Sequence, residues 1–158
     1  MWDEVLLEVY KRRHENSVLE VGTGFGYNLE LLKKAFKGAT IVTLDPEPVK
    51  VEGAHFVQGV AESLPFRDES FDLLATATTM HHVKDVEKAL QEFRRVLKCR
   101  GRVVIMDWTP NSRYNPHGPE RVAKSADEVF SLFDLYFLPI DIREEDDFYV
   151  ICGAKLCT

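Results

Sequence analysis

Three glycines at alternate positions, followed further along the chain by a carboxylate, are the residues best suited to chemistry. Gly22, Gly24 and Gly26 come directly after a short apolar run and before a helix-like pattern. Glycine permits a left-handed backbone, and it lets main-chain amides approach a ligand that a side chain would keep away. Asp45 ends the next apolar run, at about the distance at which an acid accepts hydrogen bonds from both hydroxyls of a ribose. Together they predict a nucleoside-binding site.

The glycine spacing and the charge of Glu20 distinguish between nucleoside ligands. A dinucleotide fingerprint is G-x-G-x-x-G, whereas here Gly26 comes one residue early and Tyr27 follows it. A carboxylate inside the strand end would repel a pyrophosphate. It suits a ligand with positive charge, and S-adenosylmethionine carries both an ammonium and a sulfonium. For the glycines alone, a tight strand-to-helix turn without a ligand remains the alternative.

Four motifs occur in order along the first two thirds of the chain, at 18–26, 43–46, 59–66 and 71–83. Together they resemble the class I S-adenosylmethionine-dependent methyltransferases, most closely the ubiquinone/menaquinone-biosynthesis-like group of small-molecule enzymes. The resemblance covers roughly residues 17 to 107, and the tail matches only in outline. It implies transfer of a methyl group to an oxygen, nitrogen or carbon atom of a small acceptor, with S-adenosylhomocysteine as the other product.

The resemblance also implies a role for each cofactor-binding position. The glycine turn would hold the methionine part of the cofactor, and Glu20 would hold its ammonium directly or through water. Asp45 would bind the ribose, while the backbone carbonyls of Thr76 and Ala77 would face the ammonium. The alternatives are a solvated strand-end charge for Glu20 and a turn-forming role for Asp45. The predicted cofactor-binding residues are Glu20, Gly22, Thr23, Gly24, Gly26, Asp45, Pro46, Ala61, Glu62, Thr76 and Ala77.

The adenine contacts depart from the family pattern at one position. In many relatives an Asp precedes the alanine that stands here as Ala61, whereas this chain has Val60. The resemblance therefore implies that the ring edge and its exocyclic amine are contacted by the backbone of Ala61 and the carboxylate of Glu62, or by main chain.

Two adjacent histidines, His81 and His82, follow the strand expected at 71–77. Either could act as a catalytic base, because an imidazole can deprotonate an acidic substrate near neutral pH. The alternative is a structural histidine that caps the helix beginning near Asp85. Adjacent histidines cannot both point at one ion from a regular strand or helix, and no acid or cysteine follows at ligand spacing. No metal site is therefore predicted.

Further residues are expected around the place of methyl transfer. The mouth of the site would be lined by Thr78, Thr79, Met80 and His81. Shaping of the acceptor pocket, or simple packing, is expected of Asp107, Trp108, Tyr114 and His117. Because the sulfonium is already an activated electrophile, in-line displacement needs no covalent intermediate and no nucleophile triad.

The chain has 158 residues, which is the size of one domain. We therefore expect a single methyltransferase domain over 1–158, with a short N-terminal helix and a minimal lid at about 109–125. A net charge of −6 argues against a broad grip on nucleic acid, which needs a basic face. No segment approaches the roughly 20 apolar residues of a membrane span, and a signal-peptide charge pattern is lacking. We expect a cytoplasmic protein with a small-molecule acceptor and no membrane partner.

Three cysteines, Cys99, Cys152 and Cys157, have no zinc-ligand spacing. We expect three free thiols, as in most intracellular proteins. A Cys152–Cys157 bridge is disfavoured, because an offset of five on one strand puts the two side chains on opposite faces.

Alternation of strands and helices predicts an α/β fold, a Rossmann-like doubly wound sheet that is mostly parallel with helices on both faces. The acidic run 144–147 predicts a turn between the last two strands, and the resemblance implies that this hairpin supplies one antiparallel strand near the C-terminus. The expected strands are 17–21, 40–44, 54–57, 71–77, 103–106, 137–143 and 147–156; the expected helices are 2–13, 27–36, 85–98 and 125–134.

The short lid leaves several functions open. A protein or RNA acceptor could cover the site itself, a homodimer or a partner protein could close it, or the Pro-rich segment could fold over it. A non-catalytic S-adenosylmethionine-binding module is the main alternative to an enzyme. A nicotinamide-dependent oxidoreductase is disfavoured by the glycine spacing.

Overall fold

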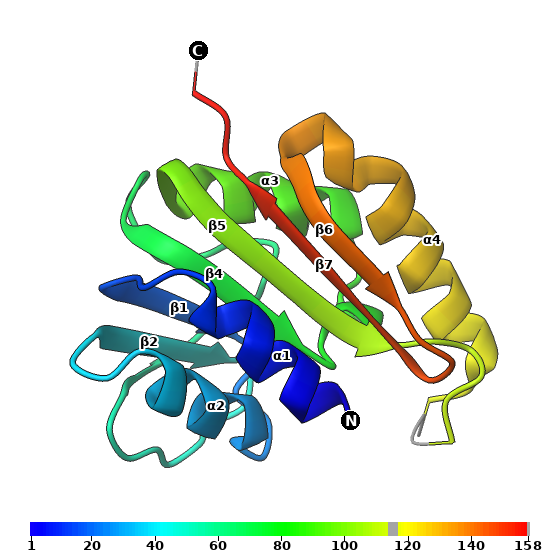
Figure 1. Ribbon diagram of the computed structural model, residues 1–158, viewed down its shortest axis with the longest axis horizontal. Helices are drawn as coiled ribbons and strands as arrows, with labels where there is room; N and C mark the ends of the chain where they lie inside the picture. The colour runs from blue at the N-terminus through cyan, green and yellow to red at the C-terminus, as the bar shows by residue number, and fades with distance from the viewer. Residues whose placement is uncertain (114–116, 158) are drawn as a thin grey trace.

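A seven-stranded sheet forms the middle layer of the molecule, with strand order β3-β2-β1-β4-β5-β7-β6 (Figure 1). The computed structural model describes residues 1–113 and 117–157. The strands are β1 (Ser17–Val21), β2 (Thr40–Asp45), β3 (His55–Gln58), β4 (Phe71–Ala77), β5 (Leu97–Trp108), β6 (Leu138–Glu144) and β7 (Phe148–Ala154). The helices are α1 (Trp2–Lys11), α2 (Tyr27–Ala35), η1 (Met80–His82, a 3₁₀ turn), α3 (Val86–Val96) and α4 (Pro119–Tyr136).

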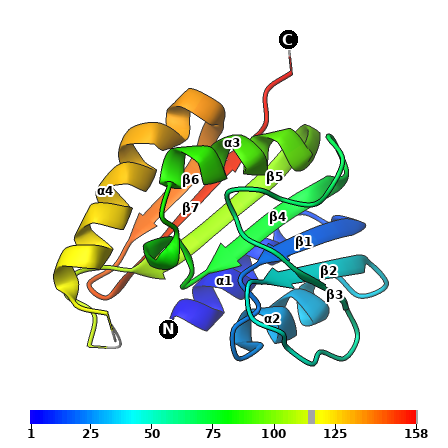
Figure 2. The same cartoon turned by 180° about the vertical axis from the view of Figure 1, so that it is seen from behind.

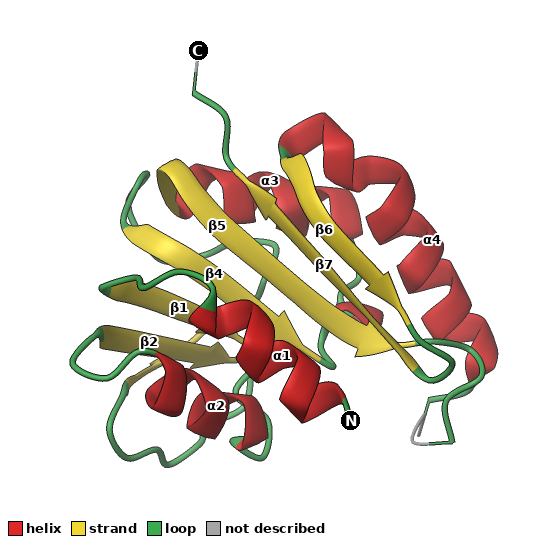
Figure 3. Ribbon diagram, viewed as in Figure 1, coloured by secondary structure: helices red, strands yellow, loops and turns green. Residues whose placement is uncertain are grey.

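The pairing of the strands confirms the predicted fold class. β1 pairs in parallel with β2 and β4, and β2 with β3 and β4 with β5 are also parallel. β7 runs antiparallel to both of its neighbours, so it is the one reversed strand (Figure 3). The strand order reverses between β1 and β4, and ligands bind at the carboxyl ends of the strands at such a switch point.

Each face of the sheet carries its own apolar core. One core lies under α1 and α2, which cover one face in Figure 1, and the other lies under α3 and α4, which come forward in Figure 2. In α3, Leu90 and Phe93 are fully buried at helical spacing, and the side chain of Asp85 caps the first turn by accepting from the Lys88 amide at 3.0 Å. Within the described residues, no helix combines the length and apolar character that crossing a membrane requires.

A buried ion pair fixes α1 against the sheet. The Arg102 guanidinium on β5 donates to both carboxylate oxygens of Glu15, at 2.8 Å each. It also donates to the carbonyls of Val9 and Tyr10, at 2.6 and 2.9 Å. Carbonyls in the last turn of a helix lack the usual i+4 partner, so Arg102 adds donors to the end of α1 while it pairs with the carboxylate.

Several predicted boundaries differ from the structure. The helix predicted at 85–98 ends at Val96, and the strand predicted at 103–106 spans Leu97–Trp108, because Leu97 already pairs with Phe71 at the start of β4.

Helix α4 begins at Pro119, earlier than the predicted 125, because proline suits the first helical position. The segment between β5 and α4 is therefore 109–118, shorter than the lid expected at 109–125. Tyr114, predicted near the acceptor, lies outside the described residues.

The prediction of three free cysteines is wrong, because Cys99 and Cys157 form a disulfide. The antiparallel register of β5 and β7 pairs Arg102 with Ala154. Backbone hydrogen bonds between Arg100, Gly101 and Lys155 continue this pairing beyond the strand end. The same register places Cys157 opposite Cys99, where side chains of an antiparallel pair lie close together. Cys152 remains a buried free thiol.

We predict that Cys157→Ser lowers the free energy of unfolding by about 2–4 kcal/mol under oxidising conditions, because the bridge closes a loop with a sequence separation of 58. Urea unfolding with and without reductant checks this. Reductant should destabilise the wild type and leave the variant unchanged, and Cys99→Ser should behave in the same way. Three titratable thiols in unreduced, denatured wild type would contradict the bridge.

Candidate active site

The first glycine of the turn is required by both conformation and space. Gly22 has a φ of +90°, in the left-handed region. A Cβ at this position would lie 2.0 Å from the Thr79 hydroxyl oxygen, so no other residue fits there. The amides of Gly22 and Thr23 donate to the Leu44 carbonyl at 2.7 and 3.1 Å, which ties the turn to the end of β2.

The other two glycines face open space. Gly24 and Gly26 also have positive φ, and an added Cβ at either would meet no heavy atom within 4 Å. Gly26 precedes α2 as its N-cap without a side-chain cap. A backbone turn with free space above it, leading into a helix N-terminus, allows close approach of a ligand. The flanking rings of Phe25 and Tyr27 are 96% and 70% exposed.

Asp45 joins the glycine turn to the end of β2. One carboxylate oxygen accepts from the Gly24 amide at 3.0 Å, and the other accepts from the Glu47 amide at 3.0 Å. The carboxylate is half-buried. The two features that predicted a nucleoside site, the glycine turn and the acid, are therefore in direct contact. Pro46, the next residue, accepts through its carbonyl from the Gln58 side chain at 2.9 Å.

Glu20 lies fully buried beneath the same turn. Its carboxylate accepts from the Asn28 amide at 2.8 Å and from the Thr43 hydroxyl at 2.6 Å. Asn28 in turn accepts from the Tyr10 hydroxyl at 2.6 Å, and the hydroxyls of Thr43 and Thr23 are 2.6 Å apart. Glu20 therefore acts on the turn from below, through Thr43 and Thr23, and it is not a solvated charge.

Burial raises the pKa of Glu20 to about 7, and the negative charge of Asp45 adds to the shift, while the donors Thr43 and Asn28 oppose it. Near neutral pH, the carboxyl is thus poised between its two protonation states. A positive ligand charge nearby would favour the ionised form.

The adenine-side residues lie in the loop after β3. Val60 and Ser63 form an isolated antiparallel bridge around buried Ala61. The Glu62 carboxylate accepts from the amides of Lys84 and Asp85 at 3.1 and 3.4 Å. Glu62 thus ties this loop to the start of α3, and only part of its hydrogen-bonding capacity remains for a ligand.

The end of β4 is held against β1. The Thr76 hydroxyl donates to the Val21 carbonyl at 2.8 Å, and the Ala77 carbonyl accepts from the Thr79 hydroxyl at 3.2 Å. Thr78 adopts a φ of 56°, unusual for a β-branched residue. These contacts place residues 76–79 directly beside Gly22.

His81 and Asp107 form a buried pair between the ends of β4 and β5. Nδ1 of His81 lies 2.9 and 3.0 Å from the two carboxylate oxygens, and the His81 amide donates to the same carboxylate at 2.9 Å. Because a carboxylate only accepts, Nδ1 carries the proton. Nε2 of the neutral ring then presents a lone pair, and it has no hydrogen-bond partner among the described residues.

His82 and His117 pack against this pair. The ring centroids of His82 and His117 lie 4.3 Å apart, and His82 lies 4.1 Å from His81. Partial desolvation lowers the pKa of His82 to about 4, and Coulombic interactions with His81, His117 and Arg121 lower it further. His82 is therefore neutral at pH 7 and a weak base.

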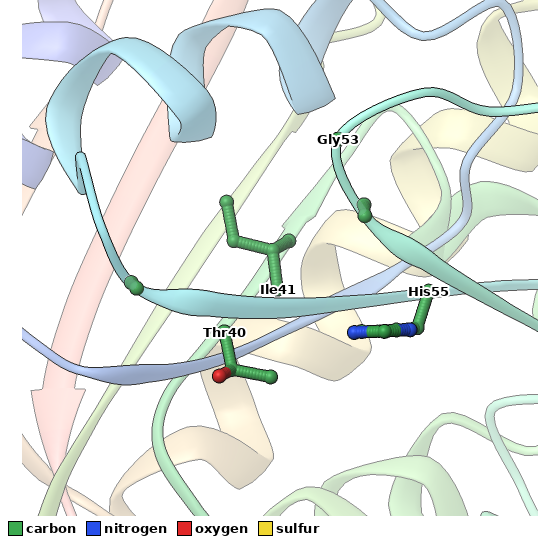
Figure 4. Close-up of a pocket in the computed structure, with 6 residues that line it drawn as sticks. Thr40, Ile41, Gly53 and His55 are labelled. Atoms are coloured by element: carbon green, nitrogen blue, oxygen red, sulfur yellow. The ribbon is translucent and has the colours of Figure 1, made fainter.

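Two hollows lie on the side of the molecule that carries β2 and the glycine turn. One is lined by Ala39, Thr40, Ile41, Gly53, Ala54 and His55 (Figure 4). Thr40 and His55 begin β2 and β3, so this hollow sits at the amino ends of the strands, opposite the ligand edge. The other is lined by Thr23 and Gly26 of the glycine turn on one side and by residues 49–52 on the other. Neither contains Asp45 or His81.

The predicted site residues thus gather at the carboxyl ends of β1, β2 and β4 and in the loop after β3. Three contributors were not predicted: Tyr10, Asn28 and Thr43. Asn28 could have been found, because a polar residue on the apolar face of a helix needs a partner. Thr43 and Tyr10 could not have been found in this way, because threonine is an ordinary residue in a strand and tyrosine is an ordinary residue in a helix.

A sheet of this order, with a glycine turn after β1 and an acid after β2, is a Rossmann-like doubly wound sheet. The methyltransferase domain family matches residues 19–105. The uncharacterized methyltransferase YcgJ of Bacillus subtilis is 34% identical over 125 residues, 73% of this chain and 47% of that protein. The demethylmenaquinone methyltransferase of Thermotoga maritima is 34% identical over 116 residues, 69% of this chain and 51% of that protein. The chain spans about half the length of these relatives.

The fold agrees with solved structures. A SAM dependent methyltransferase from Aquifex aeolicus superposes with a TM-score of 0.79 at 21% identity, covering 98% of this chain and 89% of that one. The chain therefore belongs to the methyltransferase domain family, within the class I S-adenosylmethionine-dependent methyltransferases of the ubiquinone/menaquinone-biosynthesis-like group. S-adenosylmethionine is the cofactor of this family, which confirms the predicted cofactor.

We predict that Glu20→Gln removes part of the pH dependence of stability. The folded carboxyl keeps its proton up to about pH 7, whereas the unfolded one loses it near 4.5. The stability of the wild type therefore falls as the pH rises from about 4.5 to 7, by about 3 kcal/mol. Urea unfolding at pH 5 and pH 8 should show that extra loss in the wild type, but not in Glu20→Gln. The control is Glu120→Gln, at an exposed position, and identical pH dependence in all three proteins would contradict the buried carboxyl.

Proposed function

We propose that this chain transfers a methyl group from S-adenosylmethionine, by in-line displacement, to an oxygen, nitrogen or carbon atom of a small organic acceptor. The contact between the Gly24 amide and the Asp45 carboxylate, at 3.0 Å, carries the proposal. It brings the methionine-side turn and the ribose-side acid together at one point of the sheet. Membership of the methyltransferase domain family supports it.

The residues present fit this cofactor. Open space above Gly24 and Gly26 leaves the main chain accessible, and a carboxylate with two oxygens on Asp45 matches the ribose diol. The predicted contacts of Thr23 and Pro46, of Ala61 and Glu62 with adenine, and of the Thr76 and Ala77 carbonyls with the ammonium remain proposals. Glu20 supports the turn and supplies negative charge beneath a cationic ligand.

When bound, the cofactor supplies a methyl group already activated by its sulfonium. The protein has to align the acceptor, exclude water and remove a proton where the acceptor is acidic. His81 is the base in this proposal, because Asp107 holds its Nδ1 proton and leaves Nε2 able to accept another. The low pKa of His82 makes it the weaker candidate.

The names of the relatives indicate a class of acceptor. They include the demethylmenaquinone methyltransferase of Thermotoga maritima and the ubiquinone/menaquinone biosynthesis C-methyltransferase of Hahella chejuensis, which is 31% identical over 98 residues. For this chain, we propose an acceptor with an acidic ring hydroxyl, whose deprotonation by His81 would make oxygen or ring carbon nucleophilic.

Binding without turnover is the second candidate, and the short segment at 109–118 favours it, because little chain separates β5 from α4. A Haloferax volcanii methyltransferase of the same fold was solved with its Trm112 activator, with a TM-score of 0.74 at 18% identity. A partner protein closing the site of this chain would fit that arrangement, and a homodimer is the other way in which a second chain could close it. A protein or RNA acceptor is the third candidate.

We predict that Asp45→Ala weakens S-adenosylmethionine binding at least tenfold, because the ribose loses its acceptor pair. Equilibrium dialysis measures the affinity. Asp127→Ala, exposed on α4, is the matched control and should bind as the wild type does. Unchanged affinity in Asp45→Ala would remove the site assignment. Incubation with S-adenosylmethionine and phenolic acceptors distinguishes an enzyme from a binding module, because only an enzyme releases S-adenosylhomocysteine.

A further inference from the structure

Three histidine rings from two distant segments meet beyond the ends of β4 and β5. His81 and His82 come from the 3₁₀ turn η1, and His117 comes from just before α4. One nitrogen from each ring can be chosen so that all three lie within 4.8 Å of one another. The sequence alone predicts no metal site here, because adjacent histidines on a regular strand or helix cannot both point at one ion and no acid or cysteine follows at ligand spacing. A 3₁₀ turn and a third histidine 35 residues further along provide what that pattern lacked.

One of the three rings is already oriented as a ligand. His81 is 4% exposed, and both oxygens of Asp107 lie within 3.0 Å of its Nδ1. Nε2 is therefore the nitrogen that His81 can offer to the cluster. This buried atom has no hydrogen-bond partner among the described residues, which is uncommon and calls for an explanation.

The pairing of His81 with Asp107 is the arrangement that orients metal-binding histidines in proteins. There, the ring donates its other N–H to a carboxylate, which fixes the tautomer and strengthens the ligand. Asp107 is itself held rigidly, because one of its oxygens also accepts from the Trp108 amide at 2.8 Å. We propose that His81 Nε2, with one nitrogen each from His82 and His117, binds a divalent ion of the zinc type.

The ligand set selects the ion. Neutral imidazoles suit zinc, copper, nickel and iron, whereas magnesium and calcium prefer oxygen ligands. Three protein ligands with an open fourth position are typical of catalytic zinc sites. Zn–N bonds of about 2.0–2.1 Å in a tetrahedron place the nitrogens roughly 3.4 Å apart. The exposed rings of His82 and His117 therefore close inward on buried His81 when the ion binds.

The ion would have two consequences. It would fasten His117, just before α4, to the 3₁₀ turn that follows β4. It would also present its open position to an oxygen of the acceptor and lower the pKa of that oxygen. This second consequence rests on the proposed function, whereas the metal site itself does not. His81 cannot be ligand and base at once, so in the metal-bound protein the ion replaces it in activating the acceptor.

Titration of the untagged, oxidised protein with Zn²⁺ by calorimetry, and with Co²⁺ by visible absorption, tests the proposal. Oxidised protein keeps Cys99 and Cys157 out of the measurement. We expect one ion per chain, a tetrahedral Co²⁺ spectrum, and at least tenfold weaker binding in His117→Ala. His55→Ala, exposed at the opposite edge of the sheet, is the matched control and should bind as the wild type does. Asp107→Asn should weaken binding about tenfold or more.

Wild-type binding that is absent, or equal to that of His117→Ala, would overturn the metal site. S-adenosylmethionine affinity, measured on the same samples, separates the two proposals. If the protein binds the cofactor but no metal, the proposed function stands and the metal site is removed. If it binds metal but no cofactor, the metal site stands and the proposed function is removed. A folded His117→Ala protein is expected, because His117 is exposed and lies outside helix α4.

Discussion

A buried carboxylate beneath a backbone turn is the constraint on which the rest of this structure depends. Glu20 has no access to solvent, and its hydrogen bonds lead to α2 through Asn28 and to β2 through Thr43. The chain of contacts continues from Asn28 to Tyr10 on α1, so one carboxylate connects four elements. Burying an acid costs free energy unless donors surround it. These donors offset part of that cost and hold the turn where a ligand can approach.

A second junction lies at the other side of the switch point. Asp107 at the end of β5 holds His81 after β4 by three contacts, and Thr79 packs so closely on Gly22 that only glycine fits there. The two junctions meet at residues 76–79. The site is therefore fixed to the ends of neighbouring strands, and Glu62 ties the loop after β3 to the start of α3 through the amides of Lys84 and Asp85.

The sequence predicted what depends on local pattern. Strand and helix periods located the seven strands and the four α-helices, although not the 3₁₀ turn η1. The glycine turn and Asp45 indicated the carboxyl ends of the strands as the ligand edge, because backbone conformation and ribose chemistry restrict residue type strongly. Contacts made across the sheet were missed. The Cys99–Cys157 bridge depends on the β5–β7 register, and the approach of His117 to His81 depends on how α4 begins. Neither is encoded in spacing along the chain, and the same holds for the pairing of Arg102 with Glu15.

Calorimetric titration of the wild-type protein with S-adenosylmethionine, S-adenosylhomocysteine and reduced nicotinamide dinucleotide tests the central claim most directly. The arrangement of Glu20, Gly24 and Asp45 predicts micromolar binding of the first two and none of the third. A cationic ligand with one ribose fits above a buried acid, whereas a pyrophosphate is repelled by it. Binding of the nicotinamide alone, or of none of the three, would contradict the assignment of this turn to S-adenosylmethionine.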